Sequence, residues 1–193
     1  MLSNNHADNH AGLGGLGGTN GLNGIGGLDS IYTELIAEHS RSVENRHKLP
    51  FATVSQKGRN PSCGDEITLE LQVEDGIIKD AAFTGIGCAI SQASTSIMID
   101  LVKGETVENA RHLADLFLKM IKGEITDDDE LEELDEALAL KNISRMPARV
   151  KCAVLSWRTL QEMIQISVYR REGMRLLEHL RISFVGSCTL FRL

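Results

Sequence analysis

The sequence lacks any long hydrophobic run and any excess of positive charge. No uninterrupted apolar segment approaches the roughly 18 residues that a membrane-spanning helix needs. The first residues, Met-Leu-Ser-Asn-Asn-His, do not place an apolar stretch after a basic one, as a signal peptide does. The net charge of −7 disfavours a nucleic-acid partner, because proteins that bind the phosphate backbone carry a basic face. We therefore expect a cytoplasmic protein that engages neither membrane nor nucleic acid.

Cysteine is also scarce, with four residues in a chain of 193. Their wide and irregular spacing does not resemble the dense framework of a small secreted disulfide protein. The rest of the composition, 42% hydrophobic and 24% charged, is typical of one globular domain with a core. We therefore expect reduced thiols that serve a metal or catalytic role.

Composition divides the chain into three parts. Residues 1–28 are rich in Gly, Asn, Leu and His with repeated Gly-Leu-Gly-Gly, which predicts a disordered arm. Residues 29–164 form the predicted domain, and residues 165–193 are an extension of uncertain structure in which Cys188 is expected to be an incidental thiol. The domain is expected to open with a helix capped by Asp29 or Ser30 and extending to the region of residues 39–47.

A β-hairpin is predicted between the first two cysteines. Strict alternation over residues 67–74 indicates a strand with one buried face, and Asp75-Gly76 is a hairpin turn signal before a partner strand over residues 77–84. The two-residue turn returns the second strand beside the start of the first. Cys63 and Asp65, just before the hairpin, should therefore lie close to Cys88, just after it.

Helical periodicity dominates the chain after Cys88. Helices are predicted up to Gly104, over residues 107–122, through the leucines of the acidic run 124–136, and from Pro147 onward. The acidic run is expected to be a solvated face, with docking of a partner as the alternative. Cys152 is expected in the first turns of the last helix, where the helix dipole and two neighbouring cations, Arg149 and Lys151, would favour its thiolate.

Four side chains, Cys63, Asp65, Cys88 and Cys152, could make a tetrahedral zinc set. One hard oxygen among soft sulfurs would make the site more exchangeable than an all-thiolate cage. Other interpretations stand beside this one. A cysteine on an apolar helix is often a small buried hydrophobe, Asp65 could be a turn residue, and no close Cys-x-x-Cys pair is present.

Three segments resemble the signature blocks of the IscU/NifU N-terminal superfamily. They are Asn60-Pro-Ser-Cys-Gly-Asp65, Phe83-Thr-Gly-Ile-Gly-Cys-Ala-Ile-Ser-Gln-Ala-Ser94 and Met146-Pro-Ala-Arg-Val-Lys-Cys-Ala-Val-Leu-Ser-Trp157, and the resemblance runs from about Ile31 to Ile164. The chain looks most like the SufU branch, because Lys151 stands where IscU scaffolds carry a histidine and an acidic segment lengthens the interval between the last two blocks.

This resemblance implies an α+β fold, with a small antiparallel β-sheet, helices packed against it and a metal site at one end. It implies one Zn²⁺ held by Cys63, Asp65, Cys88 and Cys152. The implied function is a zinc-dependent sulfurtransferase that accepts persulfide sulfur on Cys63 from a SufS-type cysteine desulfurase. The sulfur would then pass to downstream iron–sulfur scaffold proteins.

Two further roles are expected within that resemblance. Arg149 would stabilise the acceptor loop or the incoming persulfide, although an exposed arginine at a helix start is often only a surface residue. His39 would serve structure or partner contact and would not bind the metal. Two alternatives to sulfur transfer remain open. The thiols could hold an iron–sulfur cluster under assembly, or the zinc could be purely structural.

Overall fold

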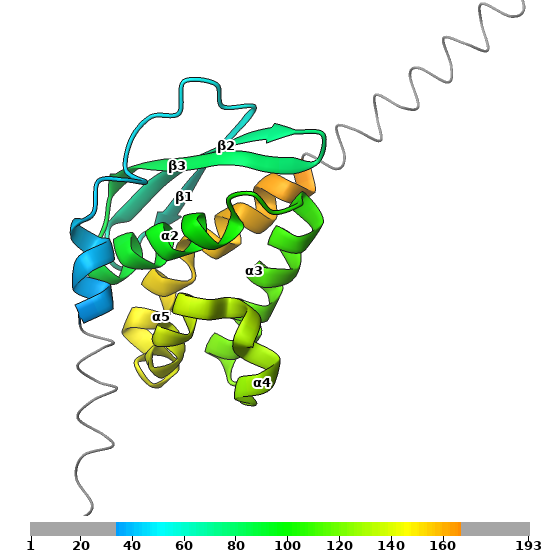
Figure 1. Ribbon diagram of the computed structural model, residues 1–193. Helices are drawn as coiled ribbons and strands as arrows, with labels where there is room; N and C mark the ends of the chain where they lie inside the picture. Colours follow the sequence, from blue (N-terminus) through cyan, green and yellow to red (C-terminus); the bar gives the residue numbers. More distant parts are fainter. Residues whose placement is uncertain (1–33, 167–193) are drawn as a thin grey trace, which may run out of the picture.

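The computed structural model describes residues 34–166 of the chain. The predicted arm, the predicted helix start at Asp29 or Ser30, and Cys188 lie outside the described residues. Within them, a three-stranded antiparallel sheet lies on one side and helices cover its inner face (Figure 1). This arrangement confirms the α+β class, and no helix among these residues is long and apolar enough to cross a membrane.

The sheet has the order β1-β2-β3, with β1 at Val54–Asn60, β2 at Asp65–Glu74 and β3 at Ile77–Ile86. The β2–β3 hairpin is as predicted, and Asp75 and Gly76 both have positive φ, as a two-residue hairpin turn requires. Strand β1 was not predicted. It is an edge strand, and its polar and charged residues disfavour pairing of the exposed edge with another chain. Its sequence has little of the apolar alternation from which a strand is predicted.

Two long helices build the core against β2 and β3. Helix α2 spans Ala89–Val102 and α3 spans Val107–Lys122, with Thr106 and Gly123 as the caps of α3. The inward β2 side chains Ile67, Leu69 and Leu71 are fully buried against these helices. The hairpin therefore rests on the core through one face and delivers both of its ends to the same side of the molecule.

The first helix ends at residue 41, within the predicted region of residues 39–47. The chain then enters a loop that places the Asn45 side chain in the interior. There its amide donates hydrogen bonds to the Ser96 backbone oxygen at 3.3 Å and to Asp100 at 2.8 Å. These bonds to α2 require a chain path that a continued helix would not follow.

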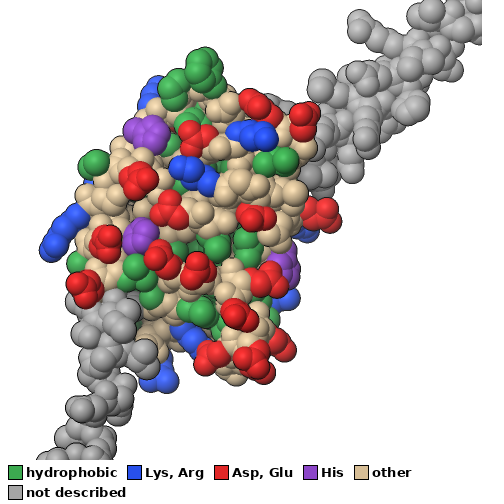
Figure 2. Space-filling view, viewed as in Figure 1, with side chains coloured by type: hydrophobic (Ala, Val, Ile, Leu, Met, Phe, Trp, Pro, Cys, Tyr) green, Lys and Arg blue, Asp and Glu red, His purple; other side chains and the backbone are tan. Residues whose placement is uncertain are grey.

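The C-terminal part contains short helices: α4 at Asp128–Leu131, the 3₁₀ segment η1 at Glu132–Arg145, α5 at Pro147–Ala153 and a helix over residues 155–166. The acidic run is exposed over α4 and η1, as predicted (Figure 2). Its leucines, Leu131 and Leu134, are buried. Packing of the last helix is anchored by Trp157, which stacks on Phe117 at 4.0 Å and donates to Ser94 Oγ at 3.0 Å.

The prediction of one continuous helix from Pro147 is wrong, because Val154 interrupts it with a ψ of −4°. The apolar stripe continues on both sides of this residue, so sequence periodicity does not register the break. As a consequence, Cys152 lies in the last turn of α5 and not in the first turns of a long helix.

Gly85 is the position in the hairpin least able to accept a side chain. It has φ of +129°, and a β-carbon there would overlap the carbonyl oxygen of its β2 neighbour Glu66. We expect Gly85→Ala to lower the free energy of unfolding by more than about 2 kcal/mol, measured by urea denaturation. Gly104→Ala is the control, because Gly104 shares a positive φ but has open space around it. Equal effects of the two changes would contradict this prediction.

Candidate metal centre

Three segments of the fold converge where the predicted ligands lie. Cys63 is in the β1–β2 turn, Asp65 opens β2, Cys88 joins β3 to α2, and Cys152 is in α5. The β1–β2 turn is closed by Asn60, whose carbonyl accepts the N–H groups of both Cys63 and Gly64 at 3.2 and 3.0 Å. The hairpin then brings Cys88 back beside Asp65, as the sequence predicts.

The ligand atoms of Cys63, Asp65 and Cys152 lie within 4.8 Å of one another. The two sulfurs of this group, in Cys63 and Cys152, are 3.1 Å apart. On a tetrahedral zinc ion with Zn–S distances near 2.3 Å, two sulfurs would lie about 3.8 Å apart. A small outward movement would therefore bring this group to the spacing that such an ion needs.

Cys88 stands outside this group of three but is attached to it. Its backbone N–H donates to Asp65 Oδ1 at 2.8 Å. Its sulfur caps helix α2 by accepting the Ser91 N–H at 3.5 Å. The structure thus places all four predicted ligands at one end of the hairpin, and we call Cys63, Asp65, Cys88 and Cys152 together the metal centre.

The three thiols of the metal centre differ in exposure and in the hydrogen bonds they receive. Cys152 is fully buried, Cys88 is half-buried and Cys63 is exposed. Cys88 receives the Ser91 N–H and Cys152 receives the Asn60 side-chain amide at 3.5 Å. Within residues 34–166, the Cys63 sulfur accepts no N–H and instead lies 3.9 Å from the Ala148 carbonyl.

Asn60 is a site residue that sequence reasoning missed. Its amide Nδ2 donates both to Asp65 Oδ2 at 3.3 Å and to Cys152 Sγ at 3.5 Å, so it bridges two predicted ligands. Asn60 and Asp65 are both buried. The available signal was the position of Asn60 at the head of the first signature block, five residues before Asp65.

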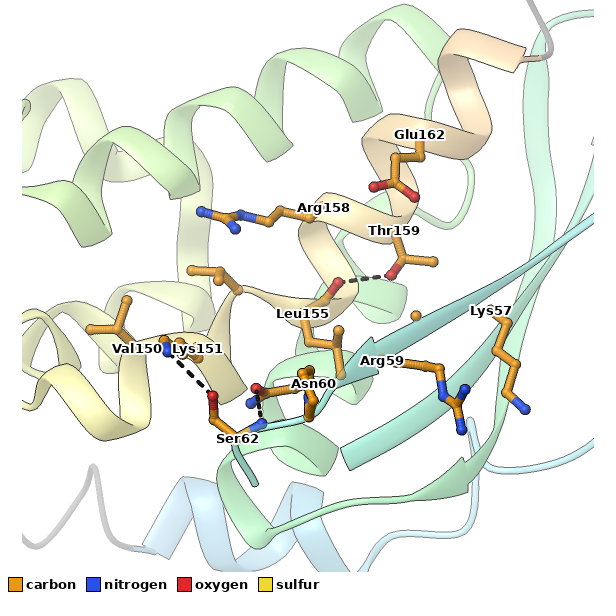
Figure 3. A pocket seen from close by; sticks show the side chains of 13 residues that line it. Lys57, Arg59, Asn60, Ser62, Val150, Lys151, Leu155, Arg158, Thr159 and Glu162 are labelled. Atoms are coloured by element: carbon orange, nitrogen blue, oxygen red, sulfur yellow. Dashed lines mark hydrogen bonds between the residues drawn. The ribbon is translucent and has the colours of Figure 1, made fainter. Parts of the chain in front are cut away.

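The predicted activation of the Cys152 thiolate by the helix dipole and the neighbouring cations is wrong. Burial raises the pKa of the Cys152 thiol far above its usual range, and contacts with Cys63, Asp65 and Cys88 raise it further. Because Cys152 lies in the last turn of α5, the positive end of the helix dipole does not stabilise its thiolate. Lys151 does not compensate, because its ammonium group donates to Ser62 Oγ at 3.2 Å (Figure 3).

Two other predicted residues take different positions. The Arg149 side chain is exposed on α5, and among the described residues it has no hydrogen bond or ion pair. His39 lies away from the thiols, where its ring nitrogens contact Ser96 at 3.0 Å and Glu136 at 3.2 Å. His39 therefore ties the first helix to α2 and η1.

A groove of about 490 Å³ opens beside the metal centre, between the end of β1 and the last two helices. Asn60 and Ser62 line it, so the groove and the metal centre share one turn. Two of its cations, Lys57 and Arg59, pair with Glu66, whose pKa is lowered chiefly by the Lys57 hydrogen bond. Arg158 also lines the groove and has no ion pair among the described residues.

The donor set fits Zn²⁺. Three sulfurs and one carboxylate oxygen, with Asp65 and Cys152 buried, match the ligand types and number of a tetrahedral zinc site. The buried Ser91 hydroxyl, which has no hydrogen-bond partner among the described residues, lies near Asp65 at the same end of the hairpin. Bound zinc would stabilise thiolates there and lower the proton affinity of each sulfur.

A family model described as the NifU-like N terminal domain matches residues 31–173. This chain belongs to that family. The match includes all four residues of the metal centre and confirms the resemblance seen in the three sequence blocks. NifU-like domains of known structure share the fold. A candidate SUF-system iron–sulfur cluster assembly scaffold protein from Fervidobacterium islandicum superposes with a TM-score of 0.65 at 35% identity, covering 70% of this chain and 97% of that one.

Two relatives of this NifU-like domain carry different functional names. The iron–sulfur cluster assembly scaffold protein IscU of Thermotoga maritima is 46% identical over 135 residues, covering 70% of this chain and 93% of that protein. The zinc-dependent sulfurtransferase SufU of Bacillus subtilis is 38% identical over 146 residues, covering 76% of this chain and 95% of that protein.

Proposed function

We propose that this protein is a zinc-dependent sulfurtransferase of iron–sulfur cluster assembly. It accepts persulfide sulfur on Cys63 from a cysteine desulfurase of the SufS type and passes that sulfur to downstream scaffold proteins. The metal centre of Cys63, Asp65, Cys88 and Cys152 holds the zinc. The observation that carries this proposal is that Cys63 is the exposed thiol of a centre whose other ligands are half-buried or buried.

Exposure favours Cys63 as the acceptor, because the Cys88 sulfur caps helix α2 and the Cys152 sulfur is buried against the Asn60 amide. A partner's persulfide can also reach Cys63 without displacing the core, because Cys63 lies in a turn and not in a helix or strand.

The transfer step is a thiol–persulfide exchange. The Cys63 thiolate attacks the outer sulfur of the desulfurase Cys–S–SH group, and a new S–S bond forms as the old one breaks. The desulfurase cysteine leaves as a thiolate, and Cys63 becomes the persulfide with its proton retained. No electrons are gained or lost overall, so the step needs no reductant.

Exposed apolar side chains beside the centre support contact with a protein partner. Ile86, two residues before Cys88, is 71% exposed, and Met146, directly before α5, is 46% exposed. Large apolar groups are enriched at the centres of protein interfaces. Each directly precedes, in sequence, a segment that contributes a ligand to the metal centre.

Two features of this chain favour sulfur transfer over cluster building. Lys151 stands where the resemblance places a histidine in scaffolds, and its ammonium group donates to Ser62 Oγ. The acidic segment over α4 and η1 lengthens the chain before the third block, as in the SufU branch. The similarity to the zinc-dependent sulfurtransferase of B. subtilis supports the same assignment.

The metal content of protein purified without air or added metal tests this proposal. We expect about one zinc per chain and negligible iron by plasma mass spectrometry, as a four-ligand zinc site predicts. Iron together with acid-labile sulfide would overturn the zinc assignment.

A second candidate function is that of a scaffold on which an iron–sulfur cluster is assembled. The 46% identity to the T. maritima scaffold favours it, and three thiols within one site suit a cluster. Anaerobic reconstitution, followed by an assay for transfer of the cluster to an apo-acceptor, distinguishes the scaffold function from sulfur transfer. Transfer would support the scaffold, and a colourless protein that accepts sulfur would support the sulfurtransferase.

Arg149 is expected to stabilise the incoming persulfide. Three thiolates and one carboxylate around Zn²⁺ leave a formal charge of −2, and Arg149 is an exposed cation near Cys152 on α5 with no ion pair among the described residues. We expect Arg149→Ala to slow single-turnover sulfur transfer about tenfold, the effect of one charge-assisted hydrogen bond. Zinc content should not change.

The matched control is Arg158→Ala. Arg158 is likewise exposed and lacks an ion pair among the described residues, but it lies in the groove along the last helix. Its replacement should leave the transfer rate within about twofold, as for most exposed charges. If both substitutions slow transfer equally, the effect is one of general surface charge and Arg149 has no specific role.

A further inference from the structure

Ser91 presents a buried hydroxyl without a partner beside the metal centre. The residue has no exposed surface, and its Oγ makes no hydrogen bond within residues 34–166. Its backbone N–H, by contrast, donates to Cys88 Sγ at 3.5 Å. Because an unsatisfied buried hydroxyl is costly, it marks a place where a partner is missing or yet to be engaged.

Gly87 shows where this hydroxyl lies. A β-carbon on Gly87 would stand 3.1 Å from Ser91 Oγ and 3.4 Å from Asp65 Oδ1, so both oxygens border the same small space. A side chain at this position would crowd both oxygens. The hydroxyl of Ser91 and the carboxylate of Asp65 therefore both lie next to the residue that precedes Cys88.

The backbone N–H at the start of α2 is not available to the Ser91 hydroxyl. The capping residue of this helix is Cys88, and its N–H already donates to Asp65 Oδ1 at 2.8 Å. The Asp65 carboxylate is therefore a nearby acceptor to which the Ser91 hydroxyl can donate.

We propose that Ser91 is a positioning residue for the metal ligand Asp65. Its hydroxyl donates a hydrogen bond to the Asp65 carboxylate when zinc binds, alongside the bonds from Cys88 N–H and the Asn60 amide. A carboxylate accepts about four hydrogen bonds, so one oxygen can bind the metal while these three donors fix its orientation. This inference rests on the zinc centre of the proposed function.

The test compares zinc affinity with the stability of the metal-free protein in Ser91→Ala. Zinc affinity is measured by competition with a chromophoric chelator, and stability by urea unfolding of protein stripped of metal. We expect the zinc Kd to rise about tenfold, as for loss of a hydrogen bond that orients a ligand. The urea midpoint of the metal-free protein should stay the same or rise, because the substitution removes an unsatisfied hydroxyl and breaks no bond.

Ser156→Ala provides the matched control. Ser156 is equally buried and its hydroxyl is also without a partner among the described residues, but it lies on the helix over residues 155–166 and not beside Asp65. Its replacement should leave the zinc Kd unchanged. A weaker Kd in both variants would overturn the specific role of Ser91.

Two other outcomes would also overturn the inference. Unchanged zinc affinity in Ser91→Ala would show that the hydroxyl does not engage the ligand. Parallel losses of affinity and of metal-free stability would show a packing role only. A wild-type protein that binds no zinc would instead overturn the proposed function, and this inference with it, so the two failures are distinguishable.

Discussion

Replacing the exposed thiol, in Cys63→Ala, is expected to abolish sulfur acceptance. Under single-turnover conditions with a cysteine desulfurase and cysteine, transfer to the protein should fall by more than about a thousandfold, because the substitution removes the nucleophile itself. The reaction can be followed by mass spectrometry of the intact chain, where acceptance appears as the mass of one added sulfur atom. Stimulation of desulfurase turnover should be lost in parallel.

Cys188→Ala is the control for thiol loss elsewhere in the chain, and it should accept sulfur at the wild-type rate. Three results would contradict the assignment of Cys63. Retained acceptance in Cys63→Ala would move the acceptor to Cys88 or Cys152. A wild-type protein that accepts no sulfur, with Cys63→Ala lowering only stability, would support a structural zinc domain. Equal losses in both variants would indicate acceptance by any accessible thiol.

The hairpin and helix α3 could be predicted from sequence because local chemistry determines them. Alternating side chains, a turn with two positive φ angles and caps at Thr106 and Gly123 act within a few residues. Strand β1 could not be predicted, because its pairing with β2 and not its own composition makes it a strand. The break at Val154 was missed for a related reason, since both sides of it share one apolar stripe.

The candidate site was likewise predictable where local sequence determines it and not where distant segments meet. The hairpin correctly brought Cys88 beside Asp65, and the resemblance supplied Cys152 from a distant segment. The high pKa of Cys152 could not be foreseen, because it arises from burial by elements far along the chain. Asn60 and Ser91 were also missed, since their roles depend on where their side chains meet the centre in three dimensions.

The metal centre also joins three segments that are far apart in sequence. The β1–β2 turn, the junction of β3 with α2, and α5 meet there, and hydrogen bonds to the Asp65 carboxylate and to the Cys152 sulfur join them. A metal ion that binds all three segments in the folded state, and only weakly in the unfolded state, stabilises the fold through mass action. Loss of the metal should therefore loosen these segments together.

Removal of zinc is accordingly expected to lower the Tm of the wild-type protein by about 10 °C. Zinc at a thousandfold excess over its Kd contributes about 4 kcal/mol, and each kcal/mol shifts the Tm by about 2–4 °C in a chain of this size. The measurement is a thermal unfolding scan before and after chelation, with recovery on adding zinc back. Cys88→Ser is the control, because serine keeps the cap on α2 but removes one sulfur ligand, so chelation should change its Tm far less. An equal fall of the Tm in both proteins would show that the chelator acts elsewhere. An unchanged Tm in the wild-type protein would mean that the metal does not contribute to the stability of the fold.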